Sequence, residues 1–327
     1  MTAAPETAPS AVLLGCPDGL DDLVRGDLRE RHGIASERVA PGVVGVDAVP
    51  AAEALGPMVE RVGLALDPSD PQRALPVLDA AAAAIGMTQP AFRVQSADPD
   101  TRSRWIDAIG ARGWPNLPAD WQLNVDLDTG RVDLGPLHWS RRVARLERLP
   151  ATTPGPVAAG LLRLAKLRPG DLLLDPCGGV GTVAIVDAVQ RGGPAISADS
   201  DAESVATARR NVAALGLDDA VEVLEADAAH LPLDDDCVDR VVSDLPFGKR
   251  IGSNELNRTL YPAILRDLER VLTADGRCVL LTDDKRVFAD AVARARGLKV
   301  VGERVIRYNG VTPTAYVVVR SRRRKRR

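Results

Sequence analysis

Two short segments of the chain combine carboxylate, glycine, proline and aromatic residues in an order that could support chemistry. The first follows an apolar run and reads Asp175-Pro176-Cys177-Gly178-Gly179-Val180-Gly181-Thr182. The second also follows an apolar run and reads Asp244-Leu245-Pro246-Phe247-Gly248. Glycines without a Cβ let the backbone approach a ligand closely, so the first segment is typical of a nucleotide-cofactor loop. The second segment presents a carboxylate, a rigid turn and an aromatic face to a flat ligand.

The first segment predicts a cofactor site at the end of a strand, since open α/β sheets bind ligands outside the carboxyl ends of their strands. An acidic residue before the glycines suits the cationic amino-acid part of S-adenosylmethionine and would repel a pyrophosphate. The pattern from Gly179 to Ala184 also fits a dinucleotide fingerprint, so a dehydrogenase stays open as an alternative. We expect cofactor contacts from Asp175, Cys177, Gly178, Gly179, Gly181, Thr182, Asp199 for the ribose, Asp227 for the adenine, and Ala228.

The second segment predicts a site for an exocyclic amine of a nucleobase. Such an amine is a poor nucleophile, because its lone pair is delocalised into the ring. The Asp244 carboxylate and the Leu245 carbonyl can accept its two hydrogens, and Pro246 fixes the turn between them. Phe247 can stack on the base, which is worth roughly 1–3 kcal/mol. Together the two segments predict methyl transfer to a base amine by orientation, with no strong general base.

Polar residues after the second segment predict the path of a phosphate backbone. They are Lys249, Arg250, Asn254, Asn257 and Arg258, and Gly248 at the end of the segment is expected to contact the substrate as well. A second group of arginines, in the stretch His138 to Arg148, includes Arg141 and Arg142. We expect both groups to contact a nucleic acid, together with Arg102, Arg104 and Arg112.

The elements that must position these residues form a regular alternation after Asp171. Strands are expected at 172–175, 195–199, 221–226, 240–244, 278–282, 298–307 and 314–320, with helices at 181–191, 202–214, 257–272 and 285–296. This alternation builds a parallel sheet covered by helices on both faces. The last connection, Tyr308 to Val311, is too short for a crossover helix, so the final two strands must form an antiparallel hairpin. The expected fold is a seven-stranded Rossmann-like sheet of the class I methyltransferase type.

The N-terminal part predicts smaller α+β units. Residues 1–50 are expected to form a ferredoxin-like region, and residues 51–140 a second unit with four short strands. Helices are expected at 19–32, 71–86, 103–111 and 157–166, the last with a threonine of Thr152-Thr153 as its N-cap. The catalytic domain is expected at 141–320, followed by a basic tail at 321–327.

Composition restricts the class of protein. Residues 1–100 hold 15 acidic and 7 basic side chains, a net of −8, whereas residues 251–327 hold 8 acidic and 18 basic, a net of +10. This asymmetry suits a partner that is a polyanion. Four scattered cysteines and three histidines argue against a zinc site, and no apolar run reaches the roughly 20 residues of a membrane span. Without a signal-peptide pattern the expected location is the cytoplasm, and the arginine- and alanine-rich composition suggests a bacterial source.

At these residues the chain resembles the THUMP-containing class I methyltransferases that modify the 2-amino group of guanosine in transfer RNA. The match is closest from Leu172 to Leu272 and includes Asp244 to Gly252, Asn257 and Leu260-Tyr261-Pro262. The family's first motif reads D-P-x-C-G-x-G-T, and here Gly178 stands in place of its cysteine. Phe92-Arg93-Val94, Trp121–Leu127 and Val132–Leu134 are similar to the THUMP strand pattern. The resemblance implies that Asp175, Asp199, Asp227 and Asp244 hold the methionine part, the ribose, the adenine and the target amine.

The sequence therefore predicts an S-adenosylmethionine-dependent methyltransferase of the guanosine 2-amino group in RNA, with transfer RNA as its partner, no metal and no membrane. Its predicted catalytic residues are Asp244, Pro246 and Phe247. Three alternatives stay open: ribosomal RNA as the target, an adenine amine in DNA as the target, and an RNA-binding protein with a relict site. The oligomeric state is left open.

Overall fold

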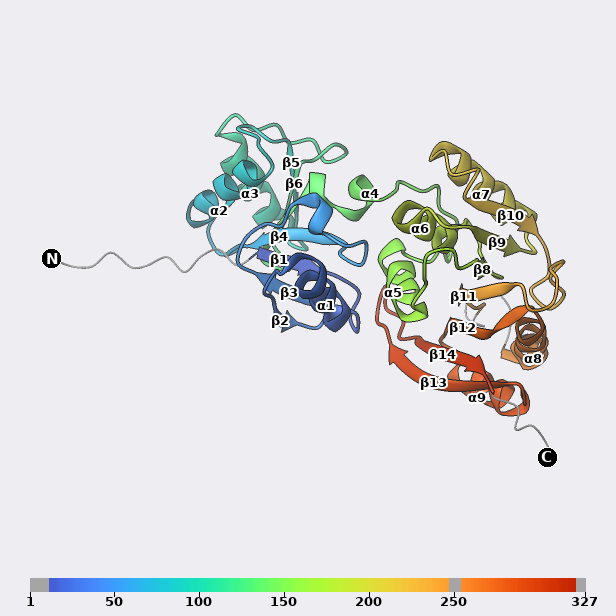
Figure 1. The fold of residues 1–327 in the computed structure, drawn as a ribbon. Coiled ribbons are helices and arrows are strands. Elements are labelled where there is room, and N and C mark those ends of the chain that lie inside the picture. The colour runs from blue at the N-terminus through green and yellow to red at the C-terminus, as the bar shows by residue number, and fades with distance from the viewer. Residues whose placement is uncertain (1–11, 247–253, 322–327) are drawn as a thin grey trace. The chain divides into compact units, whose positions relative to one another are not determined.

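The computed structural model describes residues 12–246 and 254–321. The chain divides into two compact units. Unit 1 contains the chain up to Cys16 together with Leu20–Arg142, and unit 2 contains Pro17–Gly19 and Val143–Arg327. The two seven-stranded sheets that organise them are labelled in Figure 1.

Unit 1 is built on one mainly antiparallel sheet with the strand order β2-β3-β1-β4-β7-β6-β5. Only β5 and β6 pair in parallel. The strands are β1 (Val12–Gly15), β2 (Glu37–Ala40), β3 (Val43–Val46), β4 (Arg61–Ala65), β5 (Phe92–Gln95), β6 (Leu123–Asp126) and β7 (Arg131–Leu134). The α-helices are α1 (Asp21–His32), α2 (Pro71–Ala84), α3 (Pro99–Gly110) and α4 (Trp139–Arg142).

The sheet of unit 1 runs across residue 50, because β1 pairs with β4 over four residue pairs. The expected ferredoxin-like region and the THUMP-like region thus share one sheet, and their separation into two domains stays a prediction. The helix expected at 103–111 begins earlier, at Pro99. The reason is a local signal that the sequence analysis did not use: the Asp98 side chain accepts a 3.0 Å hydrogen bond from the Thr101 N–H and caps the helix.

Unit 2 confirms the predicted class I methyltransferase sheet. Its strand order is β10-β9-β8-β11-β12-β14-β13. The five strands from β10 to β12 are parallel, and β14 pairs antiparallel with both β12 and β13. The strands are β8 (Leu173–Asp175), β9 (Ala195–Asp199), β10 (Val221–Glu225), β11 (Val238–Asp244), β12 (Leu272–Thr282), β13 (Leu298–Val305) and β14 (Thr314–Arg320). The terminal antiparallel hairpin was expected from its short connection and is confirmed.

Helices cover both faces of this sheet (Figure 1). One face packs against α8 (Asn254–Val271) and α9 (Lys285–Arg294) through a core in which Phe288 stacks on Tyr316 with ring centroids 4.5 Å apart. The helices α5 (Gly155–Ala165), α6 (Thr182–Arg191) and α7 (Ala202–Ala214) contact strands of the same sheet but contribute nothing to that core. They therefore pack on the opposite face.

Helix α5 differs from the expectation at its N-terminus. It begins at Gly155 with Pro154 in the N-cap position, and no side chain caps it. The predicted threonine cap is wrong, because the hydroxyl of Thr152 bonds to the Leu149 backbone and the hydroxyl of Thr153 bonds to Asp244. The Thr152 bond is a local one within the preceding turn, whereas the Thr153 bond is a tertiary contact that a local sequence pattern does not reveal.

Candidate active site

The cofactor loop leaves β8 at Asp175 and enters α6 at Thr182. Gly178 donates a 2.7 Å hydrogen bond to the Ala198 carbonyl of β9, which pulls the loop against that strand. A Cβ on Gly178 would lie 2.1 Å from the Ser197 Oγ, so a larger residue there requires the serine side chain to move. Glycine fits this close approach without such a shift.

Asp199 at the end of β9 holds the same loop. Its Oδ2 accepts a 2.8 Å hydrogen bond from the Gly179 N–H, and its Oδ1 accepts one of 2.9 Å from Asp201. Gly179 has a φ of +53°, and a Cβ there would meet no atom of the described residues within 4 Å. The loop therefore leaves open space above Gly179, as expected of a cradle for a ligand. The role of Asp199 on a ribose stays a proposal.

Asp175 is buried without a cation. Its side chain is 2% exposed, and its Oδ1 accepts hydrogen bonds from the Ser243 hydroxyl at 2.7 Å and the Cys177 N–H at 3.2 Å. No ion pair of Asp175 occurs among residues 12–246 and 254–321. Burial raises the pKa of Asp175 to about 7, with further contributions from the nearby Asp199 and Asp244 charges. A cationic ligand would offset this desolvation, so the loop fits the ammonium group of S-adenosylmethionine.

Other residues around the loop agree with a ligand site to different degrees. Thr182 Oγ1 is buried and lacks a hydrogen-bond partner within the described chain, so a ligand could supply one. Cys177 has a pKa raised by burial, which makes its thiol unreactive. Asp227 is 58% exposed, and its Oδ1 accepts from the Ala229 N–H at 2.8 Å. Ala228 beside it is buried.

Asp244 lies at the end of β11, beside the cofactor loop. It follows Ser243, which bonds to Asp175, so both carboxylates lie at the carboxyl edge of neighbouring strands. Oδ2 of Asp244 accepts a 2.8 Å hydrogen bond from the Thr153 hydroxyl. Oδ1 is buried and has no hydrogen-bond partner among the residues described. An unsatisfied buried acceptor is costly, and it is available to a hydrogen of a bound amine.

The electrostatics of Asp244 follow from its surroundings. Burial raises the pKa of its carboxyl group to about 7, and the Thr153 hydrogen bond to Oδ2, followed by the nearby Tyr308 hydroxyl, partly opposes this shift. Tyr308 comes from the connection between β13 and β14, and burial together with the Asp244 charge raises the pKa of its phenol. At neutral pH Asp244 is thus close to its midpoint, so a ligand that donates to it will favour the carboxylate.

The turn after Asp244 is held by a side chain from α8. The Tyr261 hydroxyl lies 2.8 Å from the Pro246 carbonyl and 2.9 Å from the Thr282 Oγ1. Leu245 is buried, and its N–H donates a 2.9 Å hydrogen bond to the Leu281 carbonyl of β12. The backbone of Leu245 and Pro246 is therefore fixed, which suits the predicted role of this segment in holding a substrate amine.

Several residues predicted to bind the substrate lie outside the described residues or make structural contacts instead. Phe247, Gly248, Lys249 and Arg250 lie outside the described residues, as do 322–327 of the basic tail, and Asn254 begins α8 with a side chain that is not described. Asn257 is 1% exposed and donates a 3.3 Å hydrogen bond to Asp284, so it joins α8 to the start of α9. It is not placed to contact a substrate directly.

The two predicted arginines near residue 140 belong to unit 1. Arg142 donates hydrogen bonds of 2.6–2.8 Å to the backbone carbonyls of Leu55, Val59 and Leu137. Burial lowers its pKa to about 10. These contacts make Arg142 a structural residue of unit 1, and we do not retain it as an RNA contact. Arg141 lies over the ring of Trp121 and donates to its carbonyl at 2.7 Å.

Sequence reasoning missed three side chains of this site: Ser243, Thr153 and Tyr308. Ser243 precedes the recognised motif, and Thr153 was interpreted as a helix cap. Tyr308 lies in a hairpin connection that was used only to assign topology. Position in the chain was the one signal that could have indicated two of these residues. Thr153 directly precedes the helix before β8, and Ser243 stands next to Asp244 in β11.

Comparison with known proteins decides the family. The sequence model of the RMKL-like methyltransferase domain matches residues 142–314, which is more than half of the chain. The chain belongs to this family. The match confirms the predicted methyltransferase fold and S-adenosylmethionine as the cofactor, in preference to a dinucleotide.

Individual relatives match parts or all of the chain. The human tRNA (guanine(6)-N(2))-methyltransferase THUMP3 is 35% identical over 191 residues, which is 53% of this chain and 37% of that protein. The tRNA (guanine(6)-N2)-methyltransferase of Thermus thermophilus is 35% identical over 181 residues, 55% of this chain and 53% of that protein. The chain thus matches between about a third and about half of the length of these relatives. The crystal structure of TrmN from Thermus thermophilus matches with a TM-score of 0.71 and 26% identity, over 95% of this chain and 99% of that one.

Within residues 12–246 and 254–321, every helix is too short or too polar to span a lipid bilayer. In the same ranges, no three His, Cys, Asp or Glu side chains come together as a metal-binding group.

Proposed function

We propose that this protein of the RMKL-like methyltransferase family methylates the 2-amino group of guanosine in RNA, with transfer RNA as its substrate class. The observation that carries the proposal is the buried Oδ1 of Asp244, which has no partner within the described chain and lies one residue from the serine that bonds to the cofactor loop. The names of the human and Thermus relatives support the choice of guanine. Those names specify position 6 of transfer RNA, so position 6 is the first to examine.

The residues of the chain supply orientation rather than strong base catalysis. When bound, S-adenosylmethionine supplies an electrophilic methyl group. Asp244 Oδ1 accepts one hydrogen of the guanine amine, and the Leu245 carbonyl is proposed to accept the other, which favours the pyramidal nitrogen with a free lone pair. Thr153 and Tyr261 hold the Asp244 carboxylate and the Pro246 turn in place. Such positioning accounts for a large part of catalysis in a reaction between two bound groups.

The proton released by the amine has an acceptor in the same site. With a pKa near 7, Asp244 can hold that proton and pass it to water after the product leaves. A transfer RNA substrate places the proposed reaction in the cytoplasm. The arginine- and alanine-rich composition is consistent with a bacterial source.

Incorporation of labelled methyl groups into bulk transfer RNA tests this function. The expected product is labelled 2-methylguanosine, identified by nucleoside mass spectrometry. Asp244→Ala should abolish labelling, while cofactor binding measured by calorimetry persists. A variant that retained full activity would overturn the mechanism.

The same assay separates the alternative targets. Label in ribosomal RNA alone, or in adenine of DNA, would change the substrate and keep the enzyme class. Retained RNA binding without any cofactor binding would identify a protein with a relict site.

A further inference from the structure

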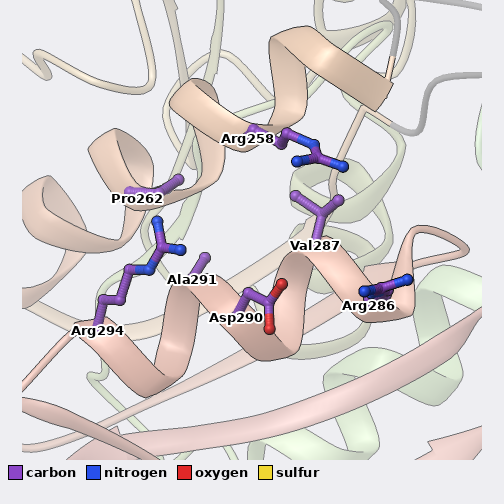
Figure 2. Close-up of a pocket in the computed structure, with 7 residues that line it drawn as sticks. All are labelled: Arg258, Pro262, Arg286, Val287, Asp290, Ala291 and Arg294. Atoms are coloured by element: carbon purple, nitrogen blue, oxygen red, sulfur yellow. The ribbon is translucent and has the colours of Figure 1, made fainter.

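A groove of about 150 Å³ lies between α8 and α9, and Asp244 is not among the residues that line it (Figure 2). Two of its lining side chains come from α8 and five from α9. Arg258 extends over Val287, and Arg294 extends towards Pro262, with Asp290 and Ala291 between them (Figure 2). The lining is Arg258, Pro262, Arg286, Val287, Asp290, Ala291 and Arg294.

The charge of this groove is strongly positive. Three arginines face one carboxylate, that of Asp290, which leaves a net charge of +2 on the lining. All three arginines are exposed, and none of them has an ion pair or a side-chain hydrogen bond among the described residues. By contrast, Arg270 of the same helix α8 is paired with Asp267 and Asp235. Arginines gathered without protein partners favour an anionic ligand.

The groove is connected to the catalytic edge of the sheet by short, rigid links. Tyr261, which holds the Pro246 carbonyl, stands one position before the Pro262 of the groove. Asn257 stands one position before Arg258, and its bond to Asp284 fixes α8 against the residue that precedes α9. Arg258 lies near the start of α8, and Arg286 lies near the start of α9, four residues after β12 ends at Thr282. The groove therefore begins within about one helical turn of residues that contact the active site.

We propose that this groove binds backbone phosphates of the RNA next to the target guanosine. The proposal rests on the proposed function. Guanidinium groups suit phosphate because they donate two parallel hydrogen bonds to its oxygens. The apolar floor of Pro262, Val287 and Ala291 holds the arginine stems and leaves the guanidinium groups at the surface. Asp290 limits the affinity, which favours release of the methylated product.

The test compares RNA binding and methylation across a matched set of variants. The triple variant Arg258→Gln/Arg286→Gln/Arg294→Gln removes the positive charge. Arg266→Gln is the control, since Arg266 is an exposed arginine of the same helix that does not line the groove. Asp290→Asn is the opposite change. The measurements are the Kd for bulk transfer RNA at several salt concentrations, the KM and kcat for methyl transfer, the cofactor Kd and the Tm.

The triple variant should raise the Kd and KM for RNA by about tenfold at moderate salt, with kcat, Tm and cofactor Kd little changed. The slope of log Kd against log salt should fall by about one per lost phosphate contact. Asp290→Asn should tighten RNA binding by about two- to threefold, which a purely structural role would not predict. Arg266→Gln should resemble the wild type.

The outcomes separate the groove from the proposed function. If the wild type methylates guanosine but the triple variant keeps its Kd and salt slope, the groove is excluded and the function stands. If the wild type labels no RNA, yet binds it with a salt slope that the triple variant lowers, the groove stands and the function fails. A wild type that binds no RNA would overturn both.

Discussion

The hydroxyl of Thr153 lies 2.8 Å from Oδ2 of Asp244, and the two residues are 91 positions apart in the chain. Thr153 precedes α5, which packs on the sheet of unit 2, and Asp244 ends β11 of the same sheet. The bond fixes the carboxylate so that its other oxygen, Oδ1, is left for a ligand. It also stabilises the charged form of a buried acid.

Replacing Thr153 should change the pH dependence of methyl transfer. The bond from Thr153 lowers the raised pKa of Asp244, so Thr153→Val should raise it further, by roughly one to two units for a hydrogen bond to a charged group. Activity needs the carboxylate, and its acid limb near pH 7 should therefore move to higher pH. Thr153→Ser should restore the wild-type profile. The measurement is kcat against pH at saturating cofactor. Superimposable profiles for the wild type, Thr153→Val and Thr153→Ser would contradict the prediction.

Removing the Asp244 charge should change stability in a pH-dependent way. The pKa of its carboxyl group is near 3.8 when unfolded and about 7 when folded, so the native state binds more protons between pH 4 and 7. Wild-type stability should therefore fall as pH rises through this window. Asp244→Asn should match the wild type at pH 4 and exceed it at pH 8, by up to a few kcal/mol.

Chemical denaturation at pH 4 and at pH 8 measures that difference in the free energy of unfolding. Asp175, whose pKa is also about 7, should leave a residual pH dependence in the variant. A variant less stable than the wild type at pH 8 would show that the neutral side chain loses more contacts than the buried charge costs.

The two glycines of the cofactor loop should respond differently to alanine. Gly178→Ala places a Cβ 2.1 Å from the Ser197 Oγ, so we expect a lower Tm, with partial recovery in Gly178→Ala/Ser197→Ala. Gly179→Ala meets no protein atom and should cost only about 1 kcal/mol for its positive φ. It should weaken cofactor binding by tenfold or more, because its Cβ projects into the cradle. The Tm and the cofactor Kd from calorimetry are measured for both variants. The prediction is contradicted if Gly178→Ala and Gly179→Ala lower the Tm equally and weaken cofactor binding equally.

Arg142 should matter for folding more than for RNA binding. Its guanidinium satisfies three backbone carbonyls of unit 1, and Arg142→Gln should lower stability by about 2–3 kcal/mol through unsatisfied acceptors. Arg141→Gln should cost less, since its side chain is partly exposed beside Trp121. Thermal unfolding separates the pair. A drop in RNA affinity without loss of stability in the Arg142 variant would return this residue to the RNA-binding surface.

Much of unit 2 is readable from the sequence, because its signals are local. Apolar runs that end in Asp175, Asp199 and Asp244 locate strands, and those carboxylates must meet at one edge of a parallel sheet. The short connection at Tyr308 requires an antiparallel hairpin. Gly178 and Gly181 mark the close turn into α6. Spacing along the chain was enough for each of these inferences, and it also led to the cofactor.

Only the tertiary structure decided how the Asp244 carboxylate is held and which polar side chains form hydrogen bonds that stabilise the fold. The Thr153 hydroxyl was equally able to cap α5 locally, and packing of that helix on the sheet directed it to Asp244 instead. Arg142 has the sequence context of a surface cation, and the placement of Leu55, Val59 and Leu137 around it makes it a half-buried donor to their carbonyls. The groove between α8 and α9 likewise depends on how these two helices, which β12 separates in the chain, pack side by side. Hydrogen-bond partners of this kind are set by the packing of distant segments against each other, so they cannot be predicted from the sequence of either segment alone.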